Sequence, residues 1–235
     1  MNRVYVALDL EFTGLDPQRD EIIEIGLVRF NGDEVQETFS SLIRARRPVP
    51  FKIQQLIGVS QDKISQAPTL QSLTGKILSF VKSYPIVGHT VEMDMQFMNR
   101  QELLLQNLAI DTFELASILV PEVQRYSLAS LASFLGIPVS QSHRALPDAL
   151  ATKDLFLALV ARAYEWDLDT LDEIVQLSAN ANWPLRQVFR DVLTERRNQG
   201  LRLLGREEKK KPAAGLRASE KQDFPPLEPT ETITP

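Results

Sequence analysis

Cysteine is absent from this chain of 235 residues, and histidine occurs only twice, as His89 and His143. The lack of cysteine excludes disulfide bonds, a thiolate nucleophile and metal sites with cysteine ligands, so any metal would need oxygen or imidazole ligands. No run of 18 apolar residues is present, and we expect no membrane span. The N-terminus lacks the apolar core and the cleavage site of a signal peptide, which favours a cytoplasmic protein.

Positive charge is also scarce. Lysine and arginine together number 26 against 31 aspartate and glutamate residues, and the formal net charge is −5. This balance argues against a broad basic face that binds nucleic acid. A local basic group does occur at Arg44, Arg46 and Arg47, for which a phosphate contact and a solvated loop are equally good interpretations.

The hydrophobic pattern predicts three antiparallel strands at the start of the chain. Residues 4–10 form a short apolar run that is typical of a strand buried on both faces. Asn31-Gly32 is a strong hairpin signal between two further strands, 21–30 and 34–43. Short strands are expected near 86–88 and 109–111. Helical spacing of apolar residues predicts helices at 69–81, around 93–104, at 115–119, at 128–135 and at 149–164.

The composition changes after residue 165. Two further helices are predicted at 169–179 and 185–197, and from Gly205 onward lysine, glutamate, proline and serine dominate. Such a segment buries too little apolar surface to offset the entropy lost on ordering. We therefore predict a domain over 1–165, a helical extension over 166–204 and a disordered tail or linker over 205–235.

Four acidic residues and one histidine stand out by their positions. Asp9 and Glu11 lie two apart at the end of the first strand, so their side chains point to the same face. Asp94 lies near the start of a predicted helix, and Asp148 lies at the start of the long helix, five residues after His143. Taken singly, these residues have ordinary interpretations as turn acids, first-turn helix acids and a surface or packing histidine.

Together, the five groups predict a site for two hard divalent cations. Clustered carboxylates repel one another, and bound cations relieve that repulsion. Two ions about 3.5–4 Å apart can hold the attacking and the leaving oxygen of a phosphoryl displacement. A histidine beside them can take the proton of the attacking water, because its pKa lies near neutrality.

These residues also carry a family resemblance. Three motifs occur in order, namely Asp9-x-Glu11-x-Thr13-Gly14, Gly88-His89 followed by Asp94, and His143-x4-Asp148. Over residues 3–165 the chain resembles the DEDDh-type 3′→5′ exonucleases, the family of the epsilon proofreading subunit of bacterial replicative DNA polymerase. The resemblance implies an α/β fold of the ribonuclease-H-like kind, with a mixed five-stranded sheet flanked by helices.

The resemblance implies a role for each motif residue. Two Mg²⁺ or Mn²⁺ ions would be held by Asp9, Glu11, Asp94 and Asp148. His143 would be the general base, and the backbone at Phe12, Thr13 and Gly14 would contact the terminal nucleotide.

Other residues are expected to be structural or depart from the family pattern. His89 is expected to be a hydrogen-bonded residue at a strand end, and the aromatic side chains of Phe51, Phe80 and Phe97 are expected in the core. The family usually has asparagine at the position of Thr90, and many members have histidine at the position of Ile57. Neither residue is a predicted metal ligand, so activity is still expected.

The predicted function is hydrolysis of nucleic acid from single-stranded or frayed 3′ ends, with DNA favoured, to give nucleoside 5′-monophosphates. One alternative is an exoribonuclease, because oligoribonucleases share the motifs. Another is a non-catalytic domain that binds nucleic acid or a partner in a larger helicase or polymerase assembly. Residues 166–235 are similar to the extension that follows this domain in DinG-like bacterial helicases and some polymerases, so a polymerase or helicase module is the expected partner there.

Overall fold

The computed structural model describes residues 3–101, 103, 105–138 and 143–210. The chain divides into two compact units, Met1–Asn198 and Gln199–Pro235, and the candidate site belongs to the first. The predicted tail over 205–235 lies mostly outside the described residues, although helix α9 (Arg186–Lys210) includes its first part. Within the described residues no helix is both long enough and apolar enough to cross a bilayer.

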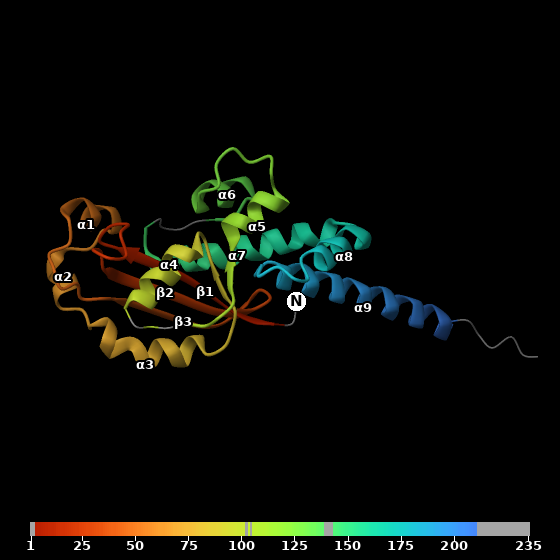
Figure 1. Cartoon of the computed structure of the whole chain (residues 1–235), viewed down its shortest axis with the longest axis horizontal. Helices are drawn as coiled ribbons and strands as arrows, with labels where there is room; N and C mark the ends of the chain where they lie inside the picture. Colours follow the sequence, from red (N-terminus) through yellow and green to blue (C-terminus); the bar gives the residue numbers. More distant parts are fainter. Residues whose placement is uncertain (1–2, 102, 104, 139–142, 211–235) are drawn as a thin grey trace, which may run out of the picture. The chain divides into compact units, whose positions relative to one another are not determined.

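A five-stranded mixed sheet forms the centre of the first unit (Figure 1). Its strands are β1 (Val4–Phe12), β2 (Ile22–Asn31), β3 (Glu34–Leu42), β4 (Ile86–Gly88) and β5 (Ala109–Asp111). Their order is β3-β2-β1-β4-β5; β1, β2 and β3 pair antiparallel, whereas β4 pairs parallel with both β1 and β5. The predicted fold class and all five predicted strands are confirmed.

Along the chain, the helices lie between β3 and β4, between β4 and β5, and after β5. They are α1 (Phe51–Ile57), α2 (Gln61–Ser65), α3 (Leu70–Val81), α4 (Val91–Arg100), α5 (Thr112–Leu119), α6 (Leu128–Phe134), α7 (Ala145–Glu165), α8 (Leu168–Leu177) and α9. Side-chain oxygens cap several of them, as at Thr69, which accepts from the Ser72 N–H, and at Asp167, which accepts from the Thr170 N–H. The sequence pattern did not predict α1 and α2, because each helix buries only one residue, Ile57 and Ile64, and so shows no period of apolar residues.

The two faces of the sheet are covered by different helices. Alternate residues of β1, namely Val6, Leu8 and Leu10, pack in one buried cluster with residues of α3 and α4. The intervening residues Tyr5 and Ala7 belong to a second cluster with residues of α5, α6 and α7. Because β1 is central and both faces are covered, it carries the continuous apolar run seen in the sequence.

Helices α8 and α9 contribute to the second cluster. Leu171, Leu185, Phe189 and Val192 are buried in the same cluster as Tyr5 of β1. The ring of Phe189 also stacks between Trp166 and Trp183, with centroid distances of 5.9 and 5.7 Å. The residues beyond the predicted exonuclease region therefore complete the core on this face of the sheet.

Candidate active site

Strand β1 presents two acidic side chains on one face of the sheet. Asp9 and Glu11 continue the alternation that places Tyr5 and Ala7 against α7, so their side chains also point to the α7 face. The register pairs Glu11 with Glu24 on β2, which brings a third carboxylate to this region. Both Asp9 and Glu11 are half-buried.

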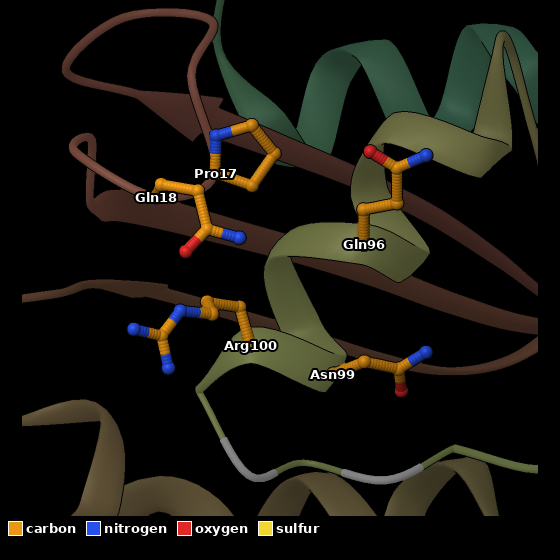
Figure 2. A pocket seen from close by; sticks show the side chains of 5 residues that line it. All are labelled: Pro17, Gln18, Gln96, Asn99 and Arg100. Carbon is orange, nitrogen blue, oxygen red and sulfur yellow. The ribbon is translucent and has the colours of Figure 1, made fainter.

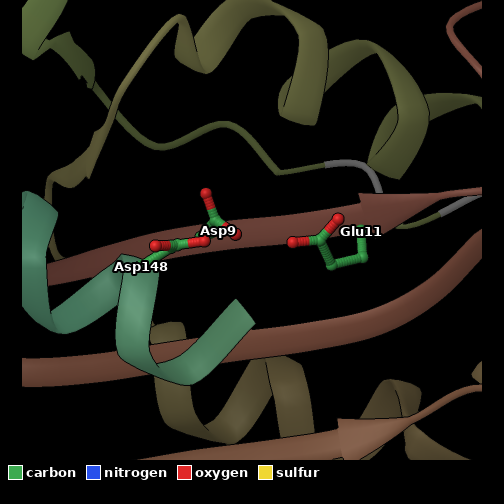
Figure 3. A group of neighbouring side chains, drawn as sticks. All are labelled: Asp9, Glu11 and Asp148. Carbon is green, nitrogen blue, oxygen red and sulfur yellow. The ribbon is translucent and has the colours of Figure 1, made fainter. Parts of the chain in front are cut away.

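The first turn of α7 brings Asp148 to the same place. Pro147 is accepted there because a first-turn residue needs no intrahelical N–H bond. The backbone N–H groups of His143 and Arg144 donate to Oδ2 of Asp148 at 2.8 and 3.3 Å, which fixes the carboxylate at the helix start. The ligand oxygens of Asp9, Glu11 and Asp148 all lie within 4.8 Å of one another, and Figure 3 shows the three side chains converging.

The carboxylates disfavour one another's charge. Burial, followed by the charges of neighbouring carboxylates, raises the pKa of Asp9 well above its ordinary value. Burial, Asp148 and Glu24 raise the pKa of Glu11 to about 7, against the opposing effect of Arg144. Three convergent oxygen donors with this mutual repulsion fit a hard divalent cation, because a bound cation would remove the electrostatic penalty.

The fourth predicted ligand, Asp94, lies on α4, next to the backbone of β1. Apolar residues of α4 pack in the cluster that contains Val6, Leu8 and Leu10 of β1, and Asp94 itself is 6% exposed. The Leu10 N–H donates to its carboxylate, while burial and the charges of Asp111 and Glu11 raise its pKa. Asp94 is close enough to raise the pKa of Asp9 but does not belong to the group of three. Its role as a metal ligand remains a prediction.

His143 lies two residues before the start of α7 and has an exposed side chain. Its φ of 62° is in the left-handed region, which histidine adopts more readily than most residues. Burial raises the pKa of Asp148, while the two backbone N–H bonds and the charge of His143 lower it. The assignment of His143 as general base stays a prediction. Residues 139–142, which precede it, lie outside the described residues.

The ion pair of Glu24 and Arg144 was not predicted. Glu24 of β2 is 1% exposed, and its carboxylate accepts from Nε and Nη2 of Arg144 at 2.9–3.2 Å. Arg144 is also the residue whose backbone N–H donates to Asp148. A glutamate inside the buried run of residues 22–30 was a signal that a partner had to exist.

The predicted substrate-binding residues form the end of β1 and the turn after it. The Thr13 N–H donates to the Glu21 carbonyl at 2.9 Å, and the Thr13 hydroxyl donates to Asp20 Oδ1 at 2.9 Å. A Cβ atom on Gly14 would lie 2.4 Å from the Asp20 carboxylate, so a larger residue there would have to displace the Asp20 side chain. Phe12 stacks on Phe97 with a centroid distance of 3.9 Å. Contact of Phe12, Thr13 and Gly14 with a nucleotide remains a prediction.

A pocket of about 440 Å³ lies between this turn and α4 (Figure 2). It is lined by Pro17, Gln18, Gln96, Asn99 and Arg100. Its polar lining groups are three amides and one guanidinium, all of which can donate hydrogen bonds.

Two further expectations concern residues around the site. His89 is hydrogen-bonded through both ring nitrogens, to Thr112 Oγ1 at 3.0 Å and to the Tyr126 carbonyl at 2.8 Å, and burial lowers its pKa. The expectation of a hydrogen-bonded residue at a strand end is confirmed.

The expectation that the aromatic residues lie in the core holds for Phe80 and Phe97, which are buried, but is wrong for Phe51, which is 71% exposed.

The comparisons with known proteins cover the same part of the chain. A sequence model of an exonuclease family, RNase_T, matches residues 6–156. The epsilon subunit of DNA polymerase III from Aquifex aeolicus is 31% identical over 165 residues, which are 68% of this chain and 82% of that subunit.

Longer relatives match as well. A PolC-type DNA polymerase III from Caldanaerobacter subterraneus is 30% identical over 174 residues, 72% of this chain and 12% of that polymerase. The 3′-5′ exonuclease DinG of Staphylococcus aureus is 29% identical over 196 residues, 81% of this chain and 22% of that protein. The chain thus spans about an eighth to a fifth of these two relatives. Exonuclease X, solved with 5′ overhanging duplex DNA, has the same fold with a TM-score of 0.59 and 22% identity over 69% of this chain and 94% of that one.

Proposed function

The chain belongs to the exonuclease family whose model matches residues 6–156, and from this premise we propose that it is a metal-dependent 3′→5′ exonuclease. Its reaction is hydrolysis of the terminal phosphodiester bond at a single-stranded or frayed 3′ end, with release of nucleoside 5′-monophosphates. The observation that carries the proposal is the convergence of Asp9, Glu11 and Asp148, from β1 and α7, to within 4.8 Å.

The metal site proposed here takes two Mg²⁺ or Mn²⁺ ions. Their chemistry, when bound, is Lewis-acid stabilisation of the negative charge on the reacting phosphate. Asp9, Glu11 and Asp148 supply convergent oxygen ligands, and Asp94 supplies a fourth carboxylate from α4. The Arg144 guanidinium, paired with Glu24, holds the start of α7 so that Asp148 keeps its place.

The remaining groups act on water and on the substrate. His143 takes the proton of the attacking water, whose oxygen forms a bond to the terminal phosphorus. The bond from phosphorus to the 3′ oxygen of the preceding nucleotide breaks, and that oxygen takes a proton from the surrounding water to become the new 3′ hydroxyl group. The backbone at Phe12, Thr13 and Gly14 contacts the departing nucleotide and fixes it over the carboxylates.

The preferred substrate is DNA. Two relatives are DNA polymerase III chains, and the structural neighbour exonuclease X was solved with DNA. An exoribonuclease of the same family is the second candidate, because the described site does not by itself select deoxyribose. We further propose that residues 1–165 form the catalytic domain, followed by a helical extension to 204 and a tail or linker, and that residues 166–235 connect to a polymerase or helicase module.

Release of labelled mononucleotide from DNA and RNA oligonucleotides with a 3′ overhang tests the proposal. We expect release with Mn²⁺ and none with EDTA. Asp9→Ala and Asp148→Ala should abolish release, and His143→Ala should reduce it by about a hundredfold or more while the protein stays folded. Asp169→Asn, an exposed carboxylate on α8, is the matched control. Wild-type turnover in Asp9→Ala would overturn the assignment, and a lack of release with every metal would favour the non-catalytic binding domain.

A further inference from the structure

The segment after β3 has a charge opposite to that of the whole chain. Between residues 43 and 61 there are four cationic residues and no acidic residue, in a protein with a net charge of −5. The four side chains, those of Arg44, Arg46, Arg47 and Lys52, are all exposed. Within the described residues no ion pair involves any of them. Their charge is therefore available to a polyanion.

Hydrogen bonds and a small core hold this segment in place. The Val49 N–H donates to Gln61 Oε1 and the Gln54 side chain donates to the Val49 carbonyl, each at 2.8 Å. Ile57 and Val59 pack with Ile23 of β2 in a separate buried cluster. Because the backbone of the segment is already ordered, less conformational entropy is lost when the cations bind a ligand.

The same segment is joined to the turn that follows β1. The antiparallel pairing places the end of β1, the start of β2 and the end of β3 at one end of the sheet. Glu21 connects them, since its carboxylate accepts from the Arg46 N–H at 2.8 Å and its carbonyl accepts from the Thr13 N–H at 2.9 Å. The cations therefore begin next to the turn that is proposed to hold the terminal nucleotide.

The same segment carries an exposed aromatic ring. Phe51, the first residue of α1, is 71% exposed and is flanked in sequence by Pro50 and Lys52. A phenylalanine gains nothing from water contact, whereas its ring can stack on any nucleobase. Cations that bind phosphates together with an aromatic platform are the combination that proteins use for single strands without sequence preference.

We infer that Arg44, Arg46, Arg47, Phe51 and Lys52, the basic segment, bind the single-stranded nucleic acid that lies upstream of the 3′ end. The phosphates contact the cations and one base stacks on Phe51, while the terminal nucleotide occupies the acidic site. The inference rests on the proposed function for the position of the 3′ end. It accounts for how a chain of net negative charge holds a polyanion.

Equilibrium binding of a fluorescent 15-residue oligothymidine in EDTA tests the basic segment without any hydrolysis. We expect the triple variant R44Q/R46Q/R47Q to bind at least about tenfold more weakly than wild type. The slope of log affinity against log salt concentration should become less steep by up to about 2, since each phosphate contact on a single strand contributes about 0.7. Phe51→Ala should weaken binding at least about fivefold without changing the slope. The control R162Q/R190Q removes two exposed cations elsewhere in the chain and should bind as wild type does.

Hydrolysis separates this inference from the proposed function. The ratio of kcat/KM for the 15-residue oligonucleotide to that for a dinucleotide should fall about tenfold in the triple variant and stay constant in R162Q/R190Q. If wild type hydrolyses neither substrate with Mn²⁺, the proposed function fails, and the EDTA binding still tests the segment.

Unchanged binding in both R44Q/R46Q/R47Q and Phe51→Ala overturns the inference. A loss of binding in Arg100→Gln instead would assign the upstream strand to the pocket beside α4. The Phe51 side chain lies outside the core, so we expect Phe51→Ala to fold even if the triple variant does not. Its binding would then still test the inference.

Discussion

The folded chain disfavours the ionised form of the Glu11 carboxylate. Its pKa is about 7 in the fold, against 4.5 for an ordinary glutamate, because burial and the charges of Asp148 and Glu24 act on it. Between these pH values the folded state therefore holds more protons at this group than the unfolded state does. The contribution of Glu11 to the free energy of unfolding consequently falls as pH rises from about 4.5 to about 7 and stays low above that pH.

Glu11→Gln should therefore stabilise the metal-free protein at alkaline pH. In EDTA at pH 8 we expect a free energy of unfolding about 1–2 kcal/mol above that of wild type, a figure that allows for solvent screening of a partly exposed group. At pH 4 the two proteins should be equally stable. Urea unfolding at both pH values measures the difference.

Metal binding provides the complementary measurement. Saturating Mg²⁺ should stabilise wild type at pH 8, whereas Glu11→Gln should lose most of that stabilisation together with its nuclease activity. Glu165→Gln, which removes an exposed carboxylate at the end of α7, is the control. A Glu11→Gln protein less stable than wild type in EDTA at pH 8 would show that this carboxylate supports the fold.

Residues of the site differ in how far local sequence determines them. The pair of Asp9 and Glu11 could be predicted because strand alternation alone places both on one face. The ion pair of Glu24 and Arg144 could not, because the partners are 120 residues apart and only the packing of α7 on β2 joins them. The position of Asp94 likewise depends on how α4 packs against β1, and the hydrophobic pattern of α4 does not specify that packing.

At the scale of elements, the site depends on how closely α7 approaches β2. A Cβ atom on Gly26 would lie 2.2 Å from the backbone of Ala145, so only glycine permits this contact. Two residues away, Glu24 binds Arg144 through the bonds described above. These contacts fix the first turn of α7, which carries Asp148, against the strand next to Asp9 and Glu11.

The two partners of this ion pair should respond unequally to mutation. Arg144→Ala leaves a carboxylate that is 2% exposed without its cation, and we expect a loss of about 3 kcal/mol. Glu24→Gln leaves an arginine whose side chain is 37% exposed and can turn to solvent, and we expect a loss of about 1 kcal/mol. The double variant should be more stable than Arg144→Ala alone. Urea unfolding of the three variants measures these differences.

A change in metal binding distinguishes positioning from simple support of the fold. We expect Glu24→Gln to weaken Mn²⁺ binding several-fold, measured by titration calorimetry at a temperature where the protein is fully folded. Arg29→Gln breaks another ion pair of β2, with Glu37, and is the matched control for metal affinity. Equal Mn²⁺ affinity in Glu24→Gln and wild type would limit this ion pair to a structural role.

Element boundaries show where the hydrophobic pattern is insufficient. Residues 93–104 were expected to share one helix, yet α4 ends at Arg100 and the Leu103 N–H donates to the Met98 carbonyl after the helix. Leu103 is fully buried in the same cluster as Phe97. An apolar residue that is buried just after the end of a helix can thus continue the helical spacing of apolar residues in the sequence.

At the scale of the whole molecule, the family match ends before the core does. The matched region ends at residue 156, whereas the cluster on the α7 face of the sheet includes Leu185, Val188 and Phe189. Phe189 and Phe156 are both fully buried in this cluster, together with Tyr5 of β1. The helical extension therefore supplies part of the interior of the exonuclease fold.

A chain that ends at Glu165 should consequently fail to fold stably. It would lose the buried side chains of Leu171, Leu185, Phe189 and Val192, each worth about 1.5–3 kcal/mol on full burial. Their sum is comparable to the whole stability of a typical domain, about 5–15 kcal/mol. We expect binding of a hydrophobic dye and no cooperative melting transition by circular dichroism. A chain that ends at Asn198 keeps all of these side chains and should melt cooperatively. If the chain ending at Glu165 melted at the same temperature as the one ending at Asn198, α8 and α9 would be an appendage, and the proposed boundary at 165 would also be the boundary of the folding unit.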